Sequence, residues 1–315
     1  MVDVTLTSMA YPNFYGEVFT IGGKERTPLL DMLNAKGVKQ ITGWEFSEGT
    51  SWTLSSSTQM HLTENEVEVA PATALPYTKT PKTNTVQLMQ YVVKVGDVKR
   101  AMSGWVKVDA TTHFGTVGQP LSLEDALVMA RREKLLQAAT DLEWHYIFSS
   151  YVKTTGETVA AQMGGILEGA ATNVVNVAAP IDRDHVNELM LLMANNGCPF
   201  RQPVMLVGGR NKQLVTKEFG VAPMDRNIGG MNIQEVETDF ARLPIIYIPK
   251  LTTDVLIVDM AFLQPVVCPV PGKGVYYFQA LGVTGAVEKE HLFAIVGLDR
   301  GPESLCLGKL TNCTI

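Results

Sequence analysis

The longest regular pattern of apolar and polar residues in the chain lies between residues 121 and 153. Apolar residues recur there as on one face of a helix, and neither glycine nor proline interrupts the segment. About 33 residues at a rise of about 1.5 Å each correspond to a rod of about 50 Å. We predict a single helix over 121–153, whose buried face consists of Val128, Leu135, Ala139, Leu142 and Tyr146.

Residues 42–95 follow a different pattern, with stretches in which apolar and polar side chains alternate. This alternation predicts β-strands, and the polar middle and the prolines of the second half indicate a long, flexible hairpin. Because an isolated hairpin is only marginally stable in water, we expect a partner to cover it. The side chains expected at that contact are Trp52, Met60, Leu62, Glu64, Glu66 and Glu68.

Helices and strands alternate between residues 166 and 258, which indicates a separate α/β lobe. A helix is predicted near 182–196, because apolar residues occur there at helical spacing and Gly197 is a typical helix stop. The other elements predicted for this lobe are strands over 203–207, 243–248 and 255–258 and a short helix that ends at Phe219.

The two ends of the chain carry less regular patterns. Residues 1–25 mix aromatic residues and glycines without a period, as expected for an extended arm, and Thr27-Pro28 then begins a short helix. The tail, residues 262–315, contains apolar stretches that predict strands returning to the main body. Taken together, the predicted helices, the long hairpin, the α/β lobe and the returning strands predict an α+β fold.

Composition narrows the class of protein to a globular one with an acidic balance. Hydrophobic residues make up 46% of the chain, enough for a sizeable core. The net charge of −6 disfavours a protein that coats or reads DNA. The N-terminus lacks the pattern of a signal peptide and no apolar stretch is long enough for a membrane helix, so we expect a cytoplasmic protein without membrane contact. The four cysteines lack the spacing of a disulfide scaffold or zinc site and are expected to be reduced thiols.

The common motifs of catalytic, metal and cofactor sites are absent from the sequence. The segment 208–212 (Gly-Gly-Arg-Asn-Lys) follows a predicted strand but lacks the spacing of a phosphate loop, so we interpret it as a strand-to-helix turn. His145 lies one helical turn after Asp141, which is typical of a surface pair. The three glutamates of the hairpin could act as acid and base, but a hairpin without a cleft favours a solvated or partner-facing edge. We therefore expect no enzyme activity, no catalytic residue, no metal and no cofactor.

The order of these elements resembles the Hong Kong 97-type capsid fold of tailed bacteriophages, whose parts are called N-arm, E-loop, P-domain with a spine helix, and A-domain. Short segments in the same order are similar to one branch of the major head proteins with that fold. They are Arg26-Thr-Pro-Leu-Leu-Asp-Met-Leu, Leu135-Leu-Gln-Ala-Ala-Thr-Asp-Leu-Glu, Met163-Gly-Gly-Ile-Leu, Val236-Glu-Thr-Asp-Phe-Ala-Arg-Leu-Pro-Ile-Ile-Tyr-Ile-Pro and Gly282-Val-Thr-Gly-Ala-Val-Glu-Lys-Glu-His-Leu. Ala241 stands where that branch has a glycine, which marks a divergent member.

The resemblance implies a major capsid protein that assembles with itself into pentamers and hexamers. These would form an icosahedral head shell around double-stranded DNA, without sequence-specific binding, in the host cytoplasm. The implied partners are a portal and a scaffold, protease or decoration proteins, and the family has no catalytic residues. The implied parts of the chain are the N-arm with its short helix (1–41), the E-loop hairpin (42–95), the P-domain with the spine helix (96–165), the A-domain (166–258) and C-terminal strands that return to the P-domain (259–315).

Two other functions remain open at this point. An encapsulin-type compartment shares the fold but encloses an enzyme in place of a genome. A hydrolase with its active site on the 166–258 lobe is the alternative from another class. It requires a nucleophile and a base in contact, a pair that the sequence does not show.

Overall fold

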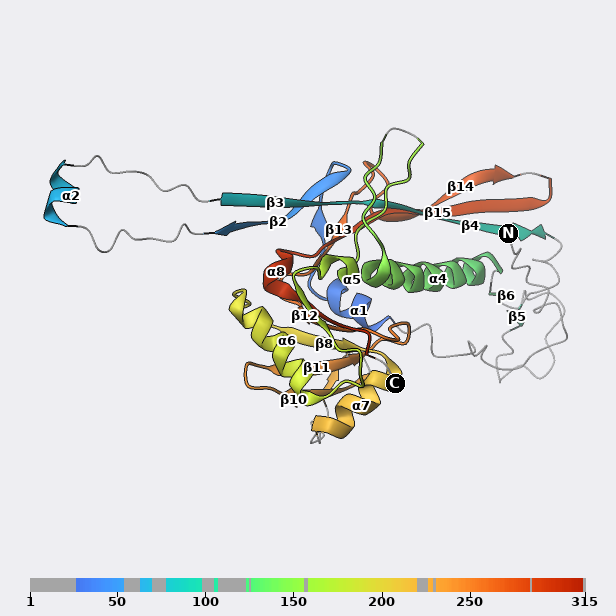
Figure 1. Ribbon diagram of the computed structural model, residues 1–315. Helices are drawn as coiled ribbons and strands as arrows, with labels where there is room; N and C mark the ends of the chain where they lie inside the picture. The colour runs from blue at the N-terminus through green and yellow to red at the C-terminus, as the bar shows by residue number, and fades with distance from the viewer. Residues whose placement is uncertain are drawn as a thin grey trace.

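The computed structural model describes residues 27–53, 63–69, 78–97, 105–106, 123–124, 126–155, 158–219, 226–228, 231–283 and 285–313. The arm predicted over 1–25, and Met60 and Leu62 of the predicted hairpin contact, lie outside these residues. Figure 1 shows a body with a long two-stranded arm at one end and the β14–β15 hairpin at the opposite end. Among the described residues, no helix has both the length and the apolar content needed to cross a membrane.

The longest helix, α4 (Ala126–Phe148), packs on a five-stranded sheet. The central strand of this sheet is β15 (Val287–Asp299), which pairs along one edge with β4 (Gln87–Gly96). Its other edge pairs with β14 (Tyr276–Val283) and then with β13 (Gln264–Val267), and β1 (Lys39–Gln40) adds a parallel strand to β13. Every second side chain of β15 between Glu290 and Val296 is buried, because the pleat turns these residues toward α4.

Helix α4 is shorter at both ends than the predicted helix over 121–153. Leu123–Glu124 form strand β6, which pairs with β5 (Trp105–Val106). After Phe148 the chain turns away, because the Ser149 carbonyl accepts a hydrogen bond from Gly165 N at 2.6 Å in place of a helical donor. The 23 residues of α4 span about 35 Å at about 1.5 Å each.

The predicted buried face of this helix is correct in its C-terminal half and wrong at Leu135. Leu142 and Tyr146 are 3% and 1% exposed, and Ala139 packs partly buried against the same core. Leu135 is 44% exposed. The body beneath α4 contacts this helix at Thr140, through Lys250, and at Glu143, through α1. Leu135 lies more than one helical turn before Thr140, so these contacts do not cover it. Val128 lies in α4, but its side chain is outside the described part of the chain.

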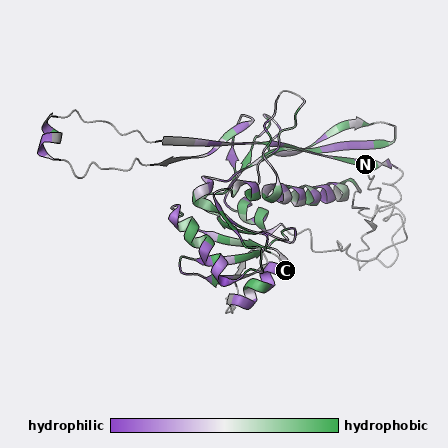
Figure 2. Cartoon of the chain, viewed as in Figure 1, coloured by the Kyte–Doolittle hydropathy of each residue, from purple (hydrophilic) through white to green (hydrophobic). Residues whose placement is uncertain are grey.

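The second sheet has seven strands in the order β7-β16-β12-β8-β11-β10-β9. The central strands β8 and β12 are buried at every position. Helices α6 and α7 cover one face of this sheet, and α1, α4 and α5 lie on the other, so both faces pack in an apolar core. Hydrophobic residues are accordingly frequent along its strands (Figure 2). The elements of this region are α1 (Pro28–Asn34), α5 (Ile166–Gly169), β7 (Asn173–Asn176), α6 (Arg183–Asn195), β8 (Pro203–Val207), α7 (Gly209–Phe219), β9 (Arg226–Ile228), β10 (Met231–Glu237), β11 (Arg242–Tyr247), β12 (Val255–Asp259), α8 (Glu303–Cys306) and β16 (Leu307–Thr311).

The sequence predicted that the strands of 259–315 return to the part of the body that contains the long helix. Strand β16 does not join the sheet beside α4. It lies between β7 and β12 in the seven-stranded sheet. Leu307, Gly308 and Leu310 are buried, as suits an interior strand, and a Cβ at Gly308 would lie 2.6 Å from Met193 Sδ of α6. The lobe therefore includes the C-terminal strand of the chain.

The part of the chain that projects from the body consists of β2 (Glu45–Thr53), α2 (Glu64–Val69) and β3 (Thr78–Thr85), and we call it the hairpin arm (Figure 1). Strands β2 and β3 pair in antiparallel register, which agrees with the predicted hairpin, whereas β4 continues into the five-stranded sheet. The alternating pattern over 42–95 predicted a strand through Glu64, Glu66 and Glu68, and this is wrong, because these residues lie on α2. A helix satisfies the backbone of this segment locally, as Val67 N shows by donating to Thr63 O at 3.2 Å.

Candidate functional site

The hairpin arm joins the body at a buried cluster of polar side chains. Glu48 of β2 is 3% exposed, and its carboxylate accepts hydrogen bonds from Nε and Nη2 of Arg300, both at 2.7 Å. Asn84 of β3 is fully buried and donates from Nδ2 to Glu48 Oε1 at 2.8 Å. Two parallel charge-assisted hydrogen bonds are strong and strongly directional. They fix the base of both strands of the hairpin arm to Arg300, which follows β15.

The same cluster also binds the turn before α5. Asn84 Nδ2 donates to Gly164 O at 3.2 Å, and Gly164 N donates back to Asn84 Oδ1 at 2.8 Å. Arg300 Nη1 donates to Gly165 O at 3.0 Å. A Cβ at Gly164 would lie 2.7 Å from Arg300 Nη1, so this position has no room for a side chain. Four segments that are far apart in sequence thus meet at the base of the hairpin arm.

A β-bulge in β2 gives Glu48 its place in the cluster. The register of β2 with β3 shifts between Ser47 and Thr50, and Gly49 has a φ of +121°. This φ favours glycine, and a Cβ there would also lie 3.2 Å from Pro302 Cδ. A bulge bends a strand and changes the direction of its side chains. The bend therefore sets where the hairpin arm leaves the body and turns the Glu48 carboxylate toward Arg300.

Two more ion pairs hold the base of the hairpin arm from the outside. Lys82 of β3 pairs with Glu303 of α8. Lys153 Nζ lies 2.9 Å from Glu45 Oε1 of β2, and the Tyr151 hydroxyl donates to the same oxygen at 3.2 Å. Exposed pairs of this kind contribute little stability each. Because one pair lies on each strand, the two pairs nevertheless help the buried cluster to fix the orientation of the hairpin arm.

The face of the five-stranded sheet that points away from α4 carries apolar side chains, and we call it the outer face. Leu88 and Val92 of β4 are 49% and 50% exposed there. Phe293 and Tyr277 lie opposite one another on β15 and β14, with ring centroids 5.6 Å apart. At the end of this face, Lys94 of β4 lies opposite Lys289 of β15 in register. The outer face thus combines exposed apolar groups with a basic end.

Of the predicted contact residues, the structure places Trp52, Glu64, Glu66 and Glu68 on the hairpin arm, and their contact with a partner stays a prediction. Glu64 and Glu68 are exposed on α2 and lie four residues apart, on one face of that helix. Trp52 lies in β2 opposite Lys79, and the side chains of Trp52 and Glu66 are outside the described part of the chain.

The sequence did not reveal the buried cluster of Glu48, Asn84 and Arg300. A glycine inside a predicted strand, at position 49, was the available signal for the bulge.

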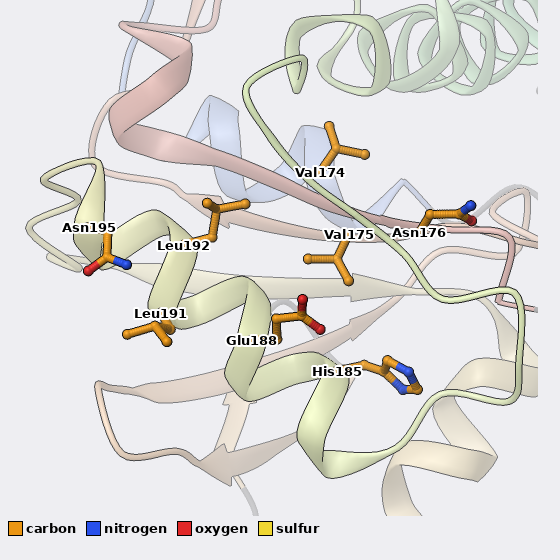
Figure 3. A pocket seen from close by; sticks show the side chains of 8 residues that line it. All are labelled: Val174, Val175, Asn176, His185, Glu188, Leu191, Leu192 and Asn195. Carbon is orange, nitrogen blue, oxygen red and sulfur yellow. The ribbon is translucent and has the colours of Figure 1, made fainter.

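An open groove of about 390 Å³ lies between α6 and β7, the edge strand of the lobe (Figure 3). Its described lining contains no serine, cysteine or lysine, the usual nucleophiles of hydrolases. Within the described ranges, no group of three or more His, Cys, Asp or Glu side chains could hold a metal ion. The groove therefore gives no support to a hydrolytic site on the lobe. The lining residues are Val174, Val175, Asn176, His185, Glu188, Leu191, Leu192 and Asn195.

The four cysteines are free thiols, and three of them are buried. Burial raises the pKa of Cys198 and of Cys313 to about 11, and it raises the pKa of Cys306 further. A thiol reacts as its thiolate, so these three groups are unreactive at neutral pH. Cys268 is half-buried.

A buried carboxylate attaches α1 to α4. Glu143 of α4 is 4% exposed, and its Oε2 accepts hydrogen bonds from Leu29 N at 3.0 Å and Leu30 N at 3.2 Å. Burial raises the pKa of Glu143 to about 7, although these two N–H groups and the charge of Lys250 act in the opposite direction. The charge of Asp31 on α1 adds to the increase. The attachment is therefore sensitive to pH near neutrality.

Glu143→Gln is expected to make folding less dependent on pH. Because the folded protein holds the Glu143 proton more tightly than the unfolded chain, stability present below about pH 4.5 is lost as the pH rises toward 7. The free energy of unfolding of Glu143→Gln, relative to the parent, should rise by roughly 2–3 kcal/mol between pH 5 and pH 8. Urea titration of unassembled protein at both pH values measures this difference. Glu133→Gln, at an exposed position of the same helix, is the control, and an equal change in both variants would contradict the assignment.

Comparisons with known proteins identify one family and one fold. A model of the SU10 major capsid protein family matches residues 2–314. The capsid asymmetric unit of cyanophage A-1(L) is 12% identical, with a TM-score of 0.61 over 100% of both chains. The holo-SrpI encapsulin of Synechococcus elongatus PCC 7942 is also 12% identical, with a TM-score of 0.57 over 96% of this chain and 91% of that chain. No curated protein sequence matches the chain, and at these identities the structural likeness shows the fold alone.

Proposed function

The chain belongs to the SU10 major capsid protein family, and from this we propose that its copies form pentamers and hexamers that close into an icosahedral phage head. It is a capsid shell protein with the α+β, Hong Kong 97-type fold that the sequence predicted. The observation that supports closed assembly is the hairpin arm, which projects from the body and pairs β2 with β3 (Figure 1). An arm on one side of a subunit and a receiving surface on another form a head-to-tail contact, and such contacts close into rings when the rotation between neighbouring copies closes.

We propose that the shell encloses double-stranded DNA and assembles in the host cytoplasm with a portal and with scaffold, protease or decoration proteins. The net charge of −6 supports a container that does not adhere to its DNA, since a polyanion is repelled by an acidic protein. The role assigned by the family is structural, and we propose no catalytic step.

We infer that the hairpin arm binds a neighbouring copy at the outer face. The outer face supplies exposed apolar groups, Leu88 and Val92, and a basic end at Lys94 and Lys289. The end of the hairpin arm supplies the exposed carboxylates of α2. Complementary charge orients such a contact, and burial of the apolar groups provides its free energy.

Purified protein is expected to form capsomers or closed shells. Sedimentation velocity and negative-stain electron microscopy over a range of salt and crowding conditions measure this directly. A stable monomer at high concentration under all of these conditions would count decisively against the proposed function.

The shared fold leaves an encapsulin-type compartment as the second candidate, because the SrpI encapsulin has a similar structure. The contents of the particle distinguish the two. Particles purified from producing cells and treated with nuclease are expected to retain protected double-stranded DNA. Particles that lack DNA and contain an enzyme at fixed stoichiometry would instead support the compartment.

A further inference from the structure

We propose that Glu48, Asn84 and Arg300 are positioning residues for assembly: their buried cluster fixes the direction in which the hairpin arm leaves the body, and this direction determines the geometry of the particle. The inference rests on the proposed function, because it assumes that the hairpin arm contacts a neighbour. It assigns the control of that contact to residues at the base of the arm, away from the contact itself.

The geometry of the cluster is suited to holding an angle. Glu48 and Asn84 lie on the two strands of the hairpin arm, while Arg300 and the turn at Gly164 and Gly165 belong to the body. The hydrogen bonds run in different directions, so a rotation of the arm about its base breaks at least one of them. Because the hairpin arm extends far from this point, a small rotation at its base displaces α2 by a larger distance (Figure 1).

The bulge at Glu48 and Gly49 supports a positional role over a purely stabilising one. A regular strand would need no residue with positive φ here, so the register shift and Gly49 mark a point where the direction of β2 is changed. Buried ion pairs are weak contributors to stability, since apolar residues of similar size often replace them without loss. What such replacements remove is the directional constraint.

The variant Glu48→Leu/Arg300→Met tests this separation. Asn84 Nδ2 keeps its bonds to the carbonyls of Gly164 and Leu298, at 3.2 and 2.9 Å, so the double variant leaves it satisfied. We expect an unchanged circular dichroism spectrum and cooperative melting, together with loss of uniform shells in favour of irregular particles or free capsomers. The matched control is Glu237→Leu/Arg242→Met, which removes an exposed ion pair of the lobe and should leave the shells uniform.

A distance measurement tests the direction of the hairpin arm without assembly. Nitroxide labels on Asn65→Cys of α2 and Asn195→Cys of α6, in a Cys268→Ser background, use exposed positions and avoid the three buried thiols. Double electron–electron resonance on unassembled protein should give one narrow distance distribution for the parent and a broadened or shifted one for Glu48→Leu/Arg300→Met.

The outcomes separate this inference from the proposed function. Equal distance distributions, or uniform shells from the double variant, would overturn the positioning role while leaving the capsid function intact. An unfolded double variant would also overturn it, because the cluster would then be required for the fold. If the parent never forms shells, the proposed function fails, and the distance measurement still decides whether the cluster directs the hairpin arm.

Discussion

Replacement of residues 51–80 by a short Gly-Ser linker is expected to abolish shell formation while the body remains folded. The cut retains the Thr50–Pro81 pair, so the bulge and the buried cluster at the base of the hairpin arm stay in place. The body has cores of its own, one around α4 and one beneath α6. Exchange of one surface connection for another changes the closure entropy by only about 1 kcal/mol or less. The replacement should therefore remove the contact between copies and leave the folding of the body unchanged.

Circular dichroism, thermal melting and electron microscopy on the same sample measure both parts of this prediction. Near-native spectra with a cooperative transition and no particles are the expected combination. A variant that fails to fold would make the hairpin arm part of the core of its own subunit. Intact shells from the shortened chain would show that the arm is dispensable for assembly.

A narrower variant tests the end of the hairpin arm alone. Glu64→Lys/Glu68→Lys reverses the two exposed carboxylates of α2 and should weaken assembly, because it places positive charge opposite the basic end of the outer face. Adding Lys94→Glu/Lys289→Glu should restore shells in part. Restoration by the combined variant is specific to this pairing, whereas equal yields in all variants, measured by sedimentation, would contradict it.

Local periodicity was sufficient to predict the elements that lie within one stretch of sequence. Helix α6, with apolar residues at helical spacing and the Gly197 stop, and the wholly buried strand β8 were both predicted correctly. The order of elements and the short motifs were enough to identify the fold, because that order is a property of the whole chain. Both kinds of signal are readable without knowledge of which segments touch.

Features that depend on contacts between distant segments could not be predicted in this way. The buried cluster joins Glu48, Asn84 and Arg300 with the turn at Gly164, and a one-residue bulge decides whether Glu48 points toward it. A glycine inside a strand, such as Gly49, can mark a bulge, but the sequence pattern does not show which distant residues the register shift brings into contact. Similarly, β16 has the composition of any apolar strand, and its place between β7 and β12 follows from packing against α6.

The exposure of Leu135 also depends on contacts between distant segments. This exposed leucine provides a control for a substitution at the buried Leu142 of the same helix. Leu142→Asp is expected to yield insoluble or unfolded protein. Leu142 is 3% exposed and packs in the core that joins α4 to the five-stranded sheet and to the lobe. An unpaired carboxylate in such a place costs several kcal/mol, which is a large part of the roughly 5–15 kcal/mol that stabilises a domain.

Leu135→Asp carries the same substitution seven residues earlier on the same helix. Its helix propensity change is equal, so a difference between the two variants isolates burial. Since Leu135 is 44% exposed, Leu135→Asp should remain soluble and melt cooperatively within a few degrees of the parent. The soluble fraction after expression and the melting curve measure both variants side by side. A soluble, cooperatively melting Leu142→Asp would mean that α4 does not rest on the core as described. Insolubility of both would mean instead that Leu135 is covered in the folded subunit, which would restore the buried face as the sequence first predicted it.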